Sequence, residues 1–355
     1  MKAGTMRRIL LVSLALVLIA SIFAPAAQAQ ASAPQTYKVL VGWENPKQGV
    51  DLSAFFPGTV TIHVGDTVHW VQNSVEIHTV TFLDGAPAPE LIQPAPPNLP
   101  SPLMLNPDIA FPTVPANNQY NGQGYANSGV MSTGPGQPTS FDLTFTQAGT
   151  YDYICLVHGV TMSGKVVVVG AGIAVNSPAK AAAKGQQQIA ALLAKVPGVF
   201  AEAAKMVTHP SRNPDGSKTY HVLLGYGKGQ IDLMRFFPRR LEVRPGDTVV
   251  WDLPGMGMLA PHTITFLNGA TGADLAMPYQ VPNGPFLILV NPAVLFPSQP
   301  GPTLTQTGIY NSGLLNPGGG PQSYSLKIGD ITGPIAYECL LHDGSGMSGT
   351  LVVDR

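Results

Sequence analysis

The sequence predicts an all-β protein with two tandem β-sandwich domains joined by a partly helical linker. Three observations support this prediction. Gly and Pro are frequent, with 39 and 34 residues, while charged residues make up only 11%, a composition suited to strands joined by turns and long loops. Most of the chain aligns with itself at offsets of 181 to 185 residues, which indicates a duplicated domain. Within each copy, apolar and polar residues alternate with the period of β-strands.

The N-terminus, residues 1–29, has the features of a secretory signal peptide. A positive segment containing Lys2 precedes the apolar residues 9–23, and Ala27-Gln28-Ala29 forms a small-residue cleavage site. An uncleaved N-terminal anchor is the alternative. We therefore expect a protein exported to the periplasm or to the extracellular cell surface. No later apolar run reaches the roughly 20 residues that a membrane-spanning helix needs.

The charge of the mature chain argues against a nucleic-acid partner. Without the three basic residues of the leader, the 19 Lys and Arg fall to 16 against 20 Asp and Glu, a net charge of −4. The sequence has no basic stripe, which is the usual mark of a nucleic-acid site. The remaining length suffices for two domains, each with its own core.

The two predicted domains, residues 30–172 and 218–355, repeat the same motifs. The aligned segments are VGDTVHW ending at Trp70 and PGDTVVW ending at Trp251, IHTVTFLDGA with His78 and PHTITFLNGA with His262, and CLVHGVTM from Cys155 and CLLHDGSGM from Cys339. Because these matches span both domains in the same order, we interpret the chain as a tandem duplication of a whole domain.

Short alternating runs on both sides of a Gly-Asp turn predict paired strands in each copy, at residues 59–71 and 241–251. The recurring tryptophans are predicted to lie in the two cores. The aspartates of the turns, Asp66 and Asp247, need no catalytic role.

Residues 173–217 form an Ala-rich linker without a counterpart in the first copy. Ile189, Leu192, Leu193 and Val196 follow the i, i+3, i+4, i+7 spacing of one helix face. Pro197-Gly198 is expected to interrupt this helix before a second, shorter one. A solvated linker would not need an apolar face, so we expect the helix to pack between the two domains.

Each copy contains one cysteine in the same sequence motif, C-x-x-H followed by a methionine. Thiolate and thioether sulfur suit Cu(I), imidazole suits both oxidation states of copper, and two His, one Cys and a weak axial Met are typical of blue-copper sites. The predicted ligands are His78, Cys155, His158 and Met162 in the first domain and His262, Cys339, His342 and Met347 in the second. The alternative is a Cys155–Cys339 disulfide, which requires Cα atoms within about 7 Å.

These motifs resemble the cupredoxin family, in particular its plastocyanin-like members, in two copies. The resemblance rests on the C-x-x-H-x₃₋₄-M loop, the upstream histidine and the GDTV-x-W strand. It implies Greek-key sandwiches, one type 1 copper ion in each domain, and electron transfer without enzymatic activity. It also implies a copper site shallowly buried beneath an exposed histidine edge, formed by His158 and His342.

Two features depart from the pattern of the family. Three residues separate His158 from Met162, whereas four separate His342 from Met347, and the longer spacing is the usual one in plastocyanin-like loops. In addition, threonine follows each upstream histidine where many members have asparagine, a neighbour that usually stabilises the thiolate. Both departures predict that the two sites differ in reduction potential.

Three classes of function are compatible with two such sites. An electron carrier would exchange electrons with redox proteins such as a cytochrome or a membrane electron-transfer complex, and two centres could relay electrons. Multicopper oxidases and nitrite reductases share the fold but need extra histidines, and the H-x-H and H-C-H motifs of the oxidases are absent. Copper storage or delivery is the remaining alternative.

The other histidines are assigned structural roles: His63, His69, His209 and His221. Met256 and Met258 precede His262 and are predicted to form an apolar rim beside the second site, with an extra soft-metal contact as the alternative.

Overall fold

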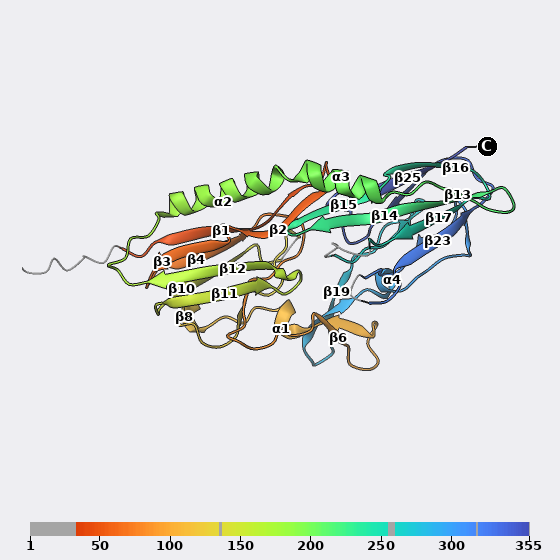
Figure 1. The fold of residues 1–355 in the computed structure, drawn as a ribbon. Helices are drawn as coiled ribbons and strands as arrows, with labels where there is room; N and C mark the ends of the chain where they lie inside the picture. Colours follow the sequence, from red (N-terminus) through yellow and green to blue (C-terminus); the bar gives the residue numbers. More distant parts are fainter. Residues whose placement is uncertain (1–32, 135–136, 255–259, 317–318, 355) are drawn as a thin grey trace, which may run out of the picture.

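The computed structural model describes residues 33–134, 137–254, 260–316 and 319–354, which form two β-sandwiches side by side (Figure 1). The predicted signal peptide and the two methionines that precede His262 lie outside the described residues. Within the described ranges, no helix has both the length and the apolar character needed to cross a membrane. The prediction of an all-β sandwich fold is confirmed.

The first sandwich has one layer with the strand order β2-β1-β4-β10-β8 and a second layer with the order β3-β12-β11-β5-β9. The strands are β1 Thr36–Asn45, β2 Val50–Phe56, β3 Thr59–His63, β4 Thr67–Gln72, β5 Thr81–Phe82, β8 Gln119–Tyr120, β9 Ala126–Asn127, β10 Ser140–Phe145, β11 Gly149–Cys155 and β12 Gly159–Val169. Trp70 lies between the layers, fully buried, and its ring contacts Phe82 and Tyr153 edge-on.

The second sandwich repeats this order, with layers β15-β14-β17-β23-β21 and β16-β25-β24-β18-β22. The strands are β14 Lys218–Lys228, β15 Ile231–Phe237, β16 Arg240–Val243, β17 Thr248–Asp252, β18 Thr265–Phe266, β21 Thr303–Leu304, β22 Tyr310–Asn311, β23 Ser323–Ile328, β24 Gly333–Glu338 and β25 Ser348–Val353; β13, Ser211–Arg212, pairs with β14. Trp251 is fully buried at the centre of this core. Both predicted core tryptophans are therefore confirmed.

The same turn geometry in both sandwiches explains the two Gly-Asp pairs. Asp66 accepts backbone hydrogen bonds from Gln35 and His63, and Asp247 accepts them from Lys218 and Arg244. Each carboxylate thus ties a β-turn to the start of the first strand of its sandwich, which agrees with a structural role.

The two sandwiches join edge to edge, because β2 pairs with β15 in antiparallel register. This pairing makes one continuous 11-stranded sheet that runs through both halves. Strand β2 is buried along its whole length. Side chains alternate across a strand, so Val50 and Leu52 face one side of the junction while Asp51 and Ser53 face the other.

Two helices cover the apolar side of the junction (Figure 1). They are α2, Pro178–Leu193, and α3, Val196–Met206. Helix α2 packs on β1 and β2, and α3 packs on β14 and β15. Ile189 and Val196 are buried in the shared core, and Leu192 and Leu193 are partly buried. The predicted apolar face therefore contacts both domains, but the break precedes Val196, and Pro197 lies in the first turn of α3, where proline is tolerated.

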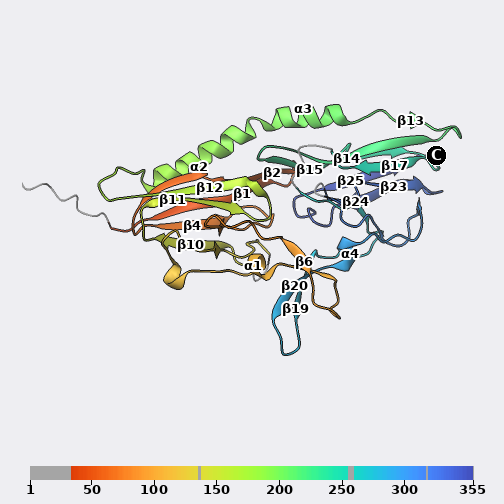
Figure 2. The ribbon, with the colours of Figure 1, turned by 60° about the horizontal axis from the view of Figure 1, so that its bottom comes forward.

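A small four-stranded sheet below the sandwiches also combines both halves (Figure 2). Its strands are β6 Ile92–Pro94, β7 Leu103–Leu105, β19 Ala276–Gln280 and β20 Phe286–Val290; the short helices α1, Pro107–Ala110, and α4, Pro292–Leu295, follow β7 and β20, and a 3₁₀ turn spans Ala116–Asn118. Leu289 of β20 pairs with Met104 of β7 and is fully buried. The long Pro-rich loops of the two domains are thus also joined.

Candidate metal centres

In the first sandwich, His78, Cys155 and His158 come together at one end of the barrel-like core. Cys155 ends β11, His158 lies on the turn to β12, and His78 forms an isolated bridge with Met131 just before β5. The Cys155 Sγ atom lies 3.8 Å from His78 Nδ1 and 3.4 Å from His158 Nδ1. All three side chains are buried, and their donor atoms are close enough to share one metal ion.

The second sandwich brings together His262, Cys339 and His342 in the same way. Cys339 follows β24, and His262 bridges to Leu315. The Cys339 Sγ atom lies 3.7 Å from His262 Nδ1 and 3.4 Å from His342 Nδ1, and the two Nδ1 atoms are 3.0 Å apart. In both halves it is therefore the Nδ1 atom of each ring that faces the sulfur.

The surroundings of each sulfur favour the thiolate, which is the form that binds metals. Burial alone would raise the pKa of the Cys155 thiol, but the charge of His158 and the hydrogen bonds of His158 and His78 lower this pKa well below its usual value. Burial would likewise raise the pKa of the Cys339 thiol, but His342 and His262 lower it well below its usual value. The donor sets therefore suit a soft cation such as copper.

The threonines that replace the usual asparagine also act on the sulfur. The backbone N–H of Thr79 donates to Cys155 Sγ at 3.4 Å, and that of Thr263 donates to Cys339 Sγ at 3.3 Å. The Thr79 hydroxyl in turn accepts from the N–H of Leu156, the residue after the cysteine. The hydrogen bond that stabilises a thiolate is thus supplied by the backbone.

The outer nitrogens of two rings are held by other side chains. Ser74 Oγ lies 2.9 Å from His78 Nε2, and Glu76 Oε2 lies 3.7 Å from His342 Nε2. Such partners fix the orientation and tautomer of a metal-binding histidine. Because Nε2 is occupied in this way, Nδ1 remains the donor to a metal.

Met162 and Met347 are both fully buried and belong to the same core cluster as the cysteine of their own half. The Cys339 N–H donates to the Met347 carbonyl at 3.0 Å. In the first half, Cys155 pairs instead with Gly159 across a bulge. The shorter spacing between His158 and Met162 therefore goes with a different backbone pairing of the loop. The role of each methionine as a fourth ligand remains a prediction.

The disulfide alternative is wrong, because both cysteines are free and each is buried in its own sandwich. Three of the four histidines assigned structural roles have ordinary partners. His69 binds Asp142, His221 binds Asp252, and His63 contacts the Ile173 carbonyl. His209 lies on an exposed segment after α3.

The expectation of an exposed histidine edge is also wrong. His158 is only 9% exposed and His342 only 4%. For His342 the reason lies in the packing of the two halves: Glu76 of the first half contacts His342 of the second, and Ser345, three residues after His342, donates to Glu76 Oε1 at 2.8 Å. His158 lies close enough to the paired strands of the junction to interact electrostatically with Asp51 and Asp232. The ring edges expected at the surface thus lie near the domain junction.

Three buried acids near both centres were not among the predicted site residues: Asp51, Glu76 and Asp232. Each interacts electrostatically with both His158 and His342. Asp51 and Asp232 lie directly opposite each other in the β2–β15 pairing, with Ser53 Oγ 2.9 Å from Asp51 and 3.3 Å from Asp232. The signal in the sequence was an aspartate at the same point of a mostly apolar strand in both halves.

Burial changes the protonation of the opposed aspartates. It raises the pKa of Asp232 to about 7 and that of Asp51 well above its usual value, against the lowering effect of His158. One carboxyl group can then donate a hydrogen bond, so the junction avoids two adjacent buried charges.

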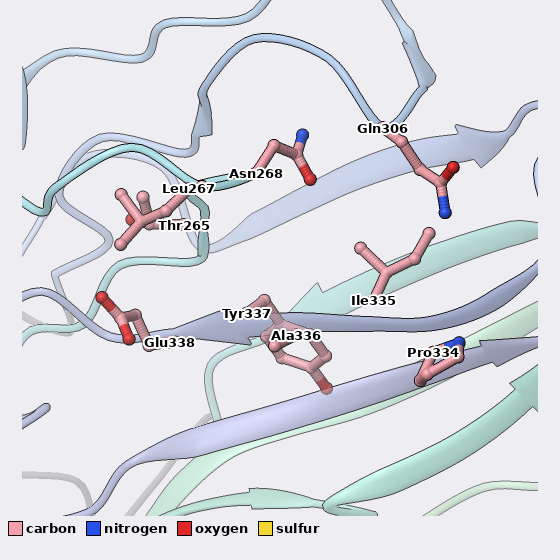
Figure 3. Close-up of a pocket in the computed structure, with 10 residues that line it drawn as sticks. Thr265, Leu267, Asn268, Gln306, Pro334, Ile335, Ala336, Tyr337 and Glu338 are labelled. Atoms are coloured by element: carbon pink, nitrogen blue, oxygen red, sulfur yellow. The ribbon is translucent and has the colours of Figure 1, made fainter.

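A hollow of about 380 Å³ lies beside β18 and β24 of the second sandwich (Figure 3). Thr265, Asn268, Tyr337 and Glu338 are among the residues that line it. None of the eight predicted metal ligands does so.

Comparison with known proteins relates the first half to copper proteins. Residues 45–169 match the family of copper binding proteins described as plastocyanin/azurin. A plastocyanin of Nostoc punctiforme is 29% identical over 140 residues, which cover 39% of this chain and 75% of that protein. The first half of the chain is thus similar to copper-binding proteins of the plastocyanin type, and both halves contain a His–Cys–His cluster.

Solved structures with similar local folds include amicyanin of Paracoccus versutus and the oxidised plastocyanin of Dryopteris crassirhizoma. Both are 21% identical to this chain with a TM-score of 0.22. The amicyanin match covers 38% of this chain and 81% of that structure, and the plastocyanin match covers 37% and 99%.

Proposed function

We propose that this chain is an exported electron carrier with one type 1 copper centre in each domain. The supporting observation is that each half buries two imidazole Nδ1 atoms beside a sulfur stabilised as thiolate. Copper would supply the one-electron Cu(II)/Cu(I) couple at these positions. The residues that would hold it are His78, Cys155, His158 and Met162 in the first centre and His262, Cys339, His342 and Met347 in the second.

The protein's contribution would be to keep each donor set in place while the charge changes. The cysteines and histidines come from strand ends and tight turns of a packed sandwich, and the Thr79 and Thr263 N–H groups point at the sulfurs. A set of ligands that is already ordered and shielded from water needs little rearrangement when one electron arrives.

The proposed partners are redox proteins such as a cytochrome or a membrane electron-transfer complex, met in the periplasm or at the cell surface. Beside His158, the loop continues into Val160, which is 79% exposed, and an exposed Thr161. We propose this loop as the place where a partner docks at the first centre. The second centre would then exchange electrons with the first inside the chain, as a relay.

A copper count combined with a visible absorption spectrum tests this function. Two copper ions per chain and intense thiolate-to-copper absorption are expected. Cys155→Ser and Cys339→Ser should each remove about half of the absorption and one copper ion, because each removes one thiolate. A protein that binds copper without this absorption, or in which one substitution removes all of it, would contradict the proposal.

Copper delivery is the second candidate, and the same preparation separates it. Delivery requires rapid loss of copper to a chelator, whereas every His and Cys of the two clusters is at most 9% exposed. Enzymatic reduction would need a further metal site. Among the described residues, the two clusters are the groups of three or more His, Cys, Asp or Glu side chains whose donor atoms lie close enough together to hold one metal ion. Consumption of oxygen or nitrite with a reduced dye would reveal such an activity.

A further inference from the structure

One carboxylate of the first domain reaches into the metal centre of the second. Glu76 is 8% exposed, its Oε2 atom lies 3.7 Å from His342 Nε2, and its Oε1 atom accepts a hydrogen bond from Ser345 at 2.8 Å. His342 and Ser345 both belong to the second metal loop, residues 342–347. Glu76 therefore contacts this loop at two points.

The backbone around Glu76 fixes this contact. Gly346 lies so close to the first domain that a Cβ atom there would overlap the Pro46 carbonyl oxygen, and Val75 lies against Gly344. Glu44 accepts the Val75 N–H at 2.7 Å and also lies 3.3 Å from Ser345 Oγ. The second metal loop is thus seated on two segments of the first domain, residues 44–46 and 75–76.

The contact has no counterpart at the first centre. In the internal alignment, Ala260 stands at the position of Glu76 and Gly227 at that of Glu44. Thr161, which aligns with Ser345, donates to the carbonyl of His158 within its own loop. Burial alone would raise the pKa of Glu76, but the charges of the nearby histidines lower it. Among these histidines, His342 has the largest lowering effect on this pKa, followed by His158 and His78.

A negative charge beside a metal ligand favours the oxidation state with the higher positive charge. We propose that Glu76 positions His342 across the domain junction and holds the second centre at a lower reduction potential than the first. This inference rests on the two-centre function proposed above. A single electron shared by the two centres then resides mainly on the first: the second centre is oxidised by one electron and the first is reduced by one. No bond is formed or broken in this exchange.

Glu76→Gln tests the charge, because the amide has nearly the same size and can still accept the hydrogen bond from Ser345. The potential of the second centre is measured in the Cys155→Ser background, which leaves only that centre. The reduced-to-oxidised ratio at a fixed applied potential should rise by roughly tenfold, or about 59 mV for one electron. In the Cys339→Ser background, the first centre should change by less than half as much.

Two control variants and one metal-free measurement complete the test. Glu44→Gln removes a charge that touches the same loop but no ligand ring, and should have a smaller effect; the exposed Glu90→Gln should have none. In the copper-free protein, the NMR signals of the His342 ring should stay near their unaltered positions in Glu76→Gln and move in Glu76→Ala, because only the first keeps a side chain of the same size against His342 Nε2 and Ser345 Oγ.

The outcomes separate this inference from the function on which it rests. Missing thiolate-to-copper absorption in the unaltered protein would overturn the electron-carrier function. Normal absorption with equal shifts at both centres, or with no shift in Glu76→Gln, would overturn the role of Glu76 alone.

Discussion

The two metal loops have the same donors but different surroundings. The first, residues 158–162, exposes Val160 and Thr161. The second, residues 342–347, buries Ser345 and presses Gly346 against Pro46 of the other domain. The two halves contain the same His–Cys–His cluster, whereas the contact between them distinguishes the two loops. Asymmetry between the two centres is therefore expected from the junction more than from the ligands.

The junction itself has a symmetric and an asymmetric part. The β2–β15 pairing places the equivalent residues Asp51 and Asp232 opposite each other. Glu44 and Glu76, by contrast, belong to the first domain only. The symmetric part should govern how firmly the two halves hold together, and the asymmetric part should govern how the centres differ.

The largest effect is expected from Gly346→Ala compared with Gly159→Ala. Both glycines have positive φ, +79° and +63°, so a side chain costs about 1–2 kcal/mol at either position. At Gly346 the new Cβ also overlaps the Pro46 carbonyl, whereas at Gly159 nothing lies within 4 Å. We expect Gly346→Ala to lose roughly 3 kcal/mol of unfolding free energy in total, and Gly159→Ala only the backbone part.

Urea unfolding measures the loss of unfolding free energy in each glycine variant. Copper absorption in the variants that keep a single centre shows which centre each substitution perturbs. The Gly346 substitution should perturb the second centre and leave the first intact. Equal losses for the two glycines would mean that the second loop does not rest on the first domain as described.

The symmetric part of the junction predicts a pH dependence of stability. The pKa of Asp232 is raised by burial from 3.8 to about 7. Between these values the folded state binds more protons than the unfolded state, so stability falls as the pH rises from about 4 to about 7. The loss from this carboxyl group should be on the order of a few kcal/mol. Asp232→Asn should remove this part and leave the part that comes from Asp51, whose pKa is also raised by burial.

Urea unfolding of the copper-free protein at several pH values checks this prediction. His158 and His342 both have pKa values raised to about 9, so their contribution is lost at higher pH, between about 6.5 and 9. Asp152→Asn, at an exposed position, should keep the original slope. An unchanged slope in Asp232→Asn would show that burial does not raise the pKa of Asp232.

The sequence predicted the features that depend on local pattern. The sandwich class follows from alternating strands and Gly-Asp turns, and the clustering of Cys155 with His158 follows from a short loop at a strand end. These features are decided within one domain. A resemblance between the two copies was enough to locate the corresponding residues in the second.

The arrangement of the two domains could not be obtained in this way. Strand β2 is an edge strand in an isolated sandwich, and nothing in its own pattern specifies β15 as its partner. Burial of His158 and His342 and the contact made by Glu76 follow from that pairing. Asp51 and Asp232 were the available clue, because a carboxylate repeated within an apolar strand needs a buried partner.

The smallest effect on stability is expected at Val160. Since this side chain is 79% exposed, Val160→Ser should change the unfolding free energy by no more than about 0.5 kcal/mol. If a partner buries it on docking, the loss of apolar contact should weaken association by about 1 kcal/mol, or roughly fivefold. Stopped-flow electron exchange with a small soluble cytochrome at high ionic strength measures this change.

Val64→Ser provides the matched control for Val160. Val64 is 45% exposed, and the parallel pairing of β3 with β12 places it beyond Val169, at the opposite end of β12 from Gly159. The control should exchange electrons at the unaltered rate. If both substitutions slow exchange equally, or if neither does, the partner reaches the chain elsewhere, and the exposed loop of the first centre is then only a structural difference between the two halves.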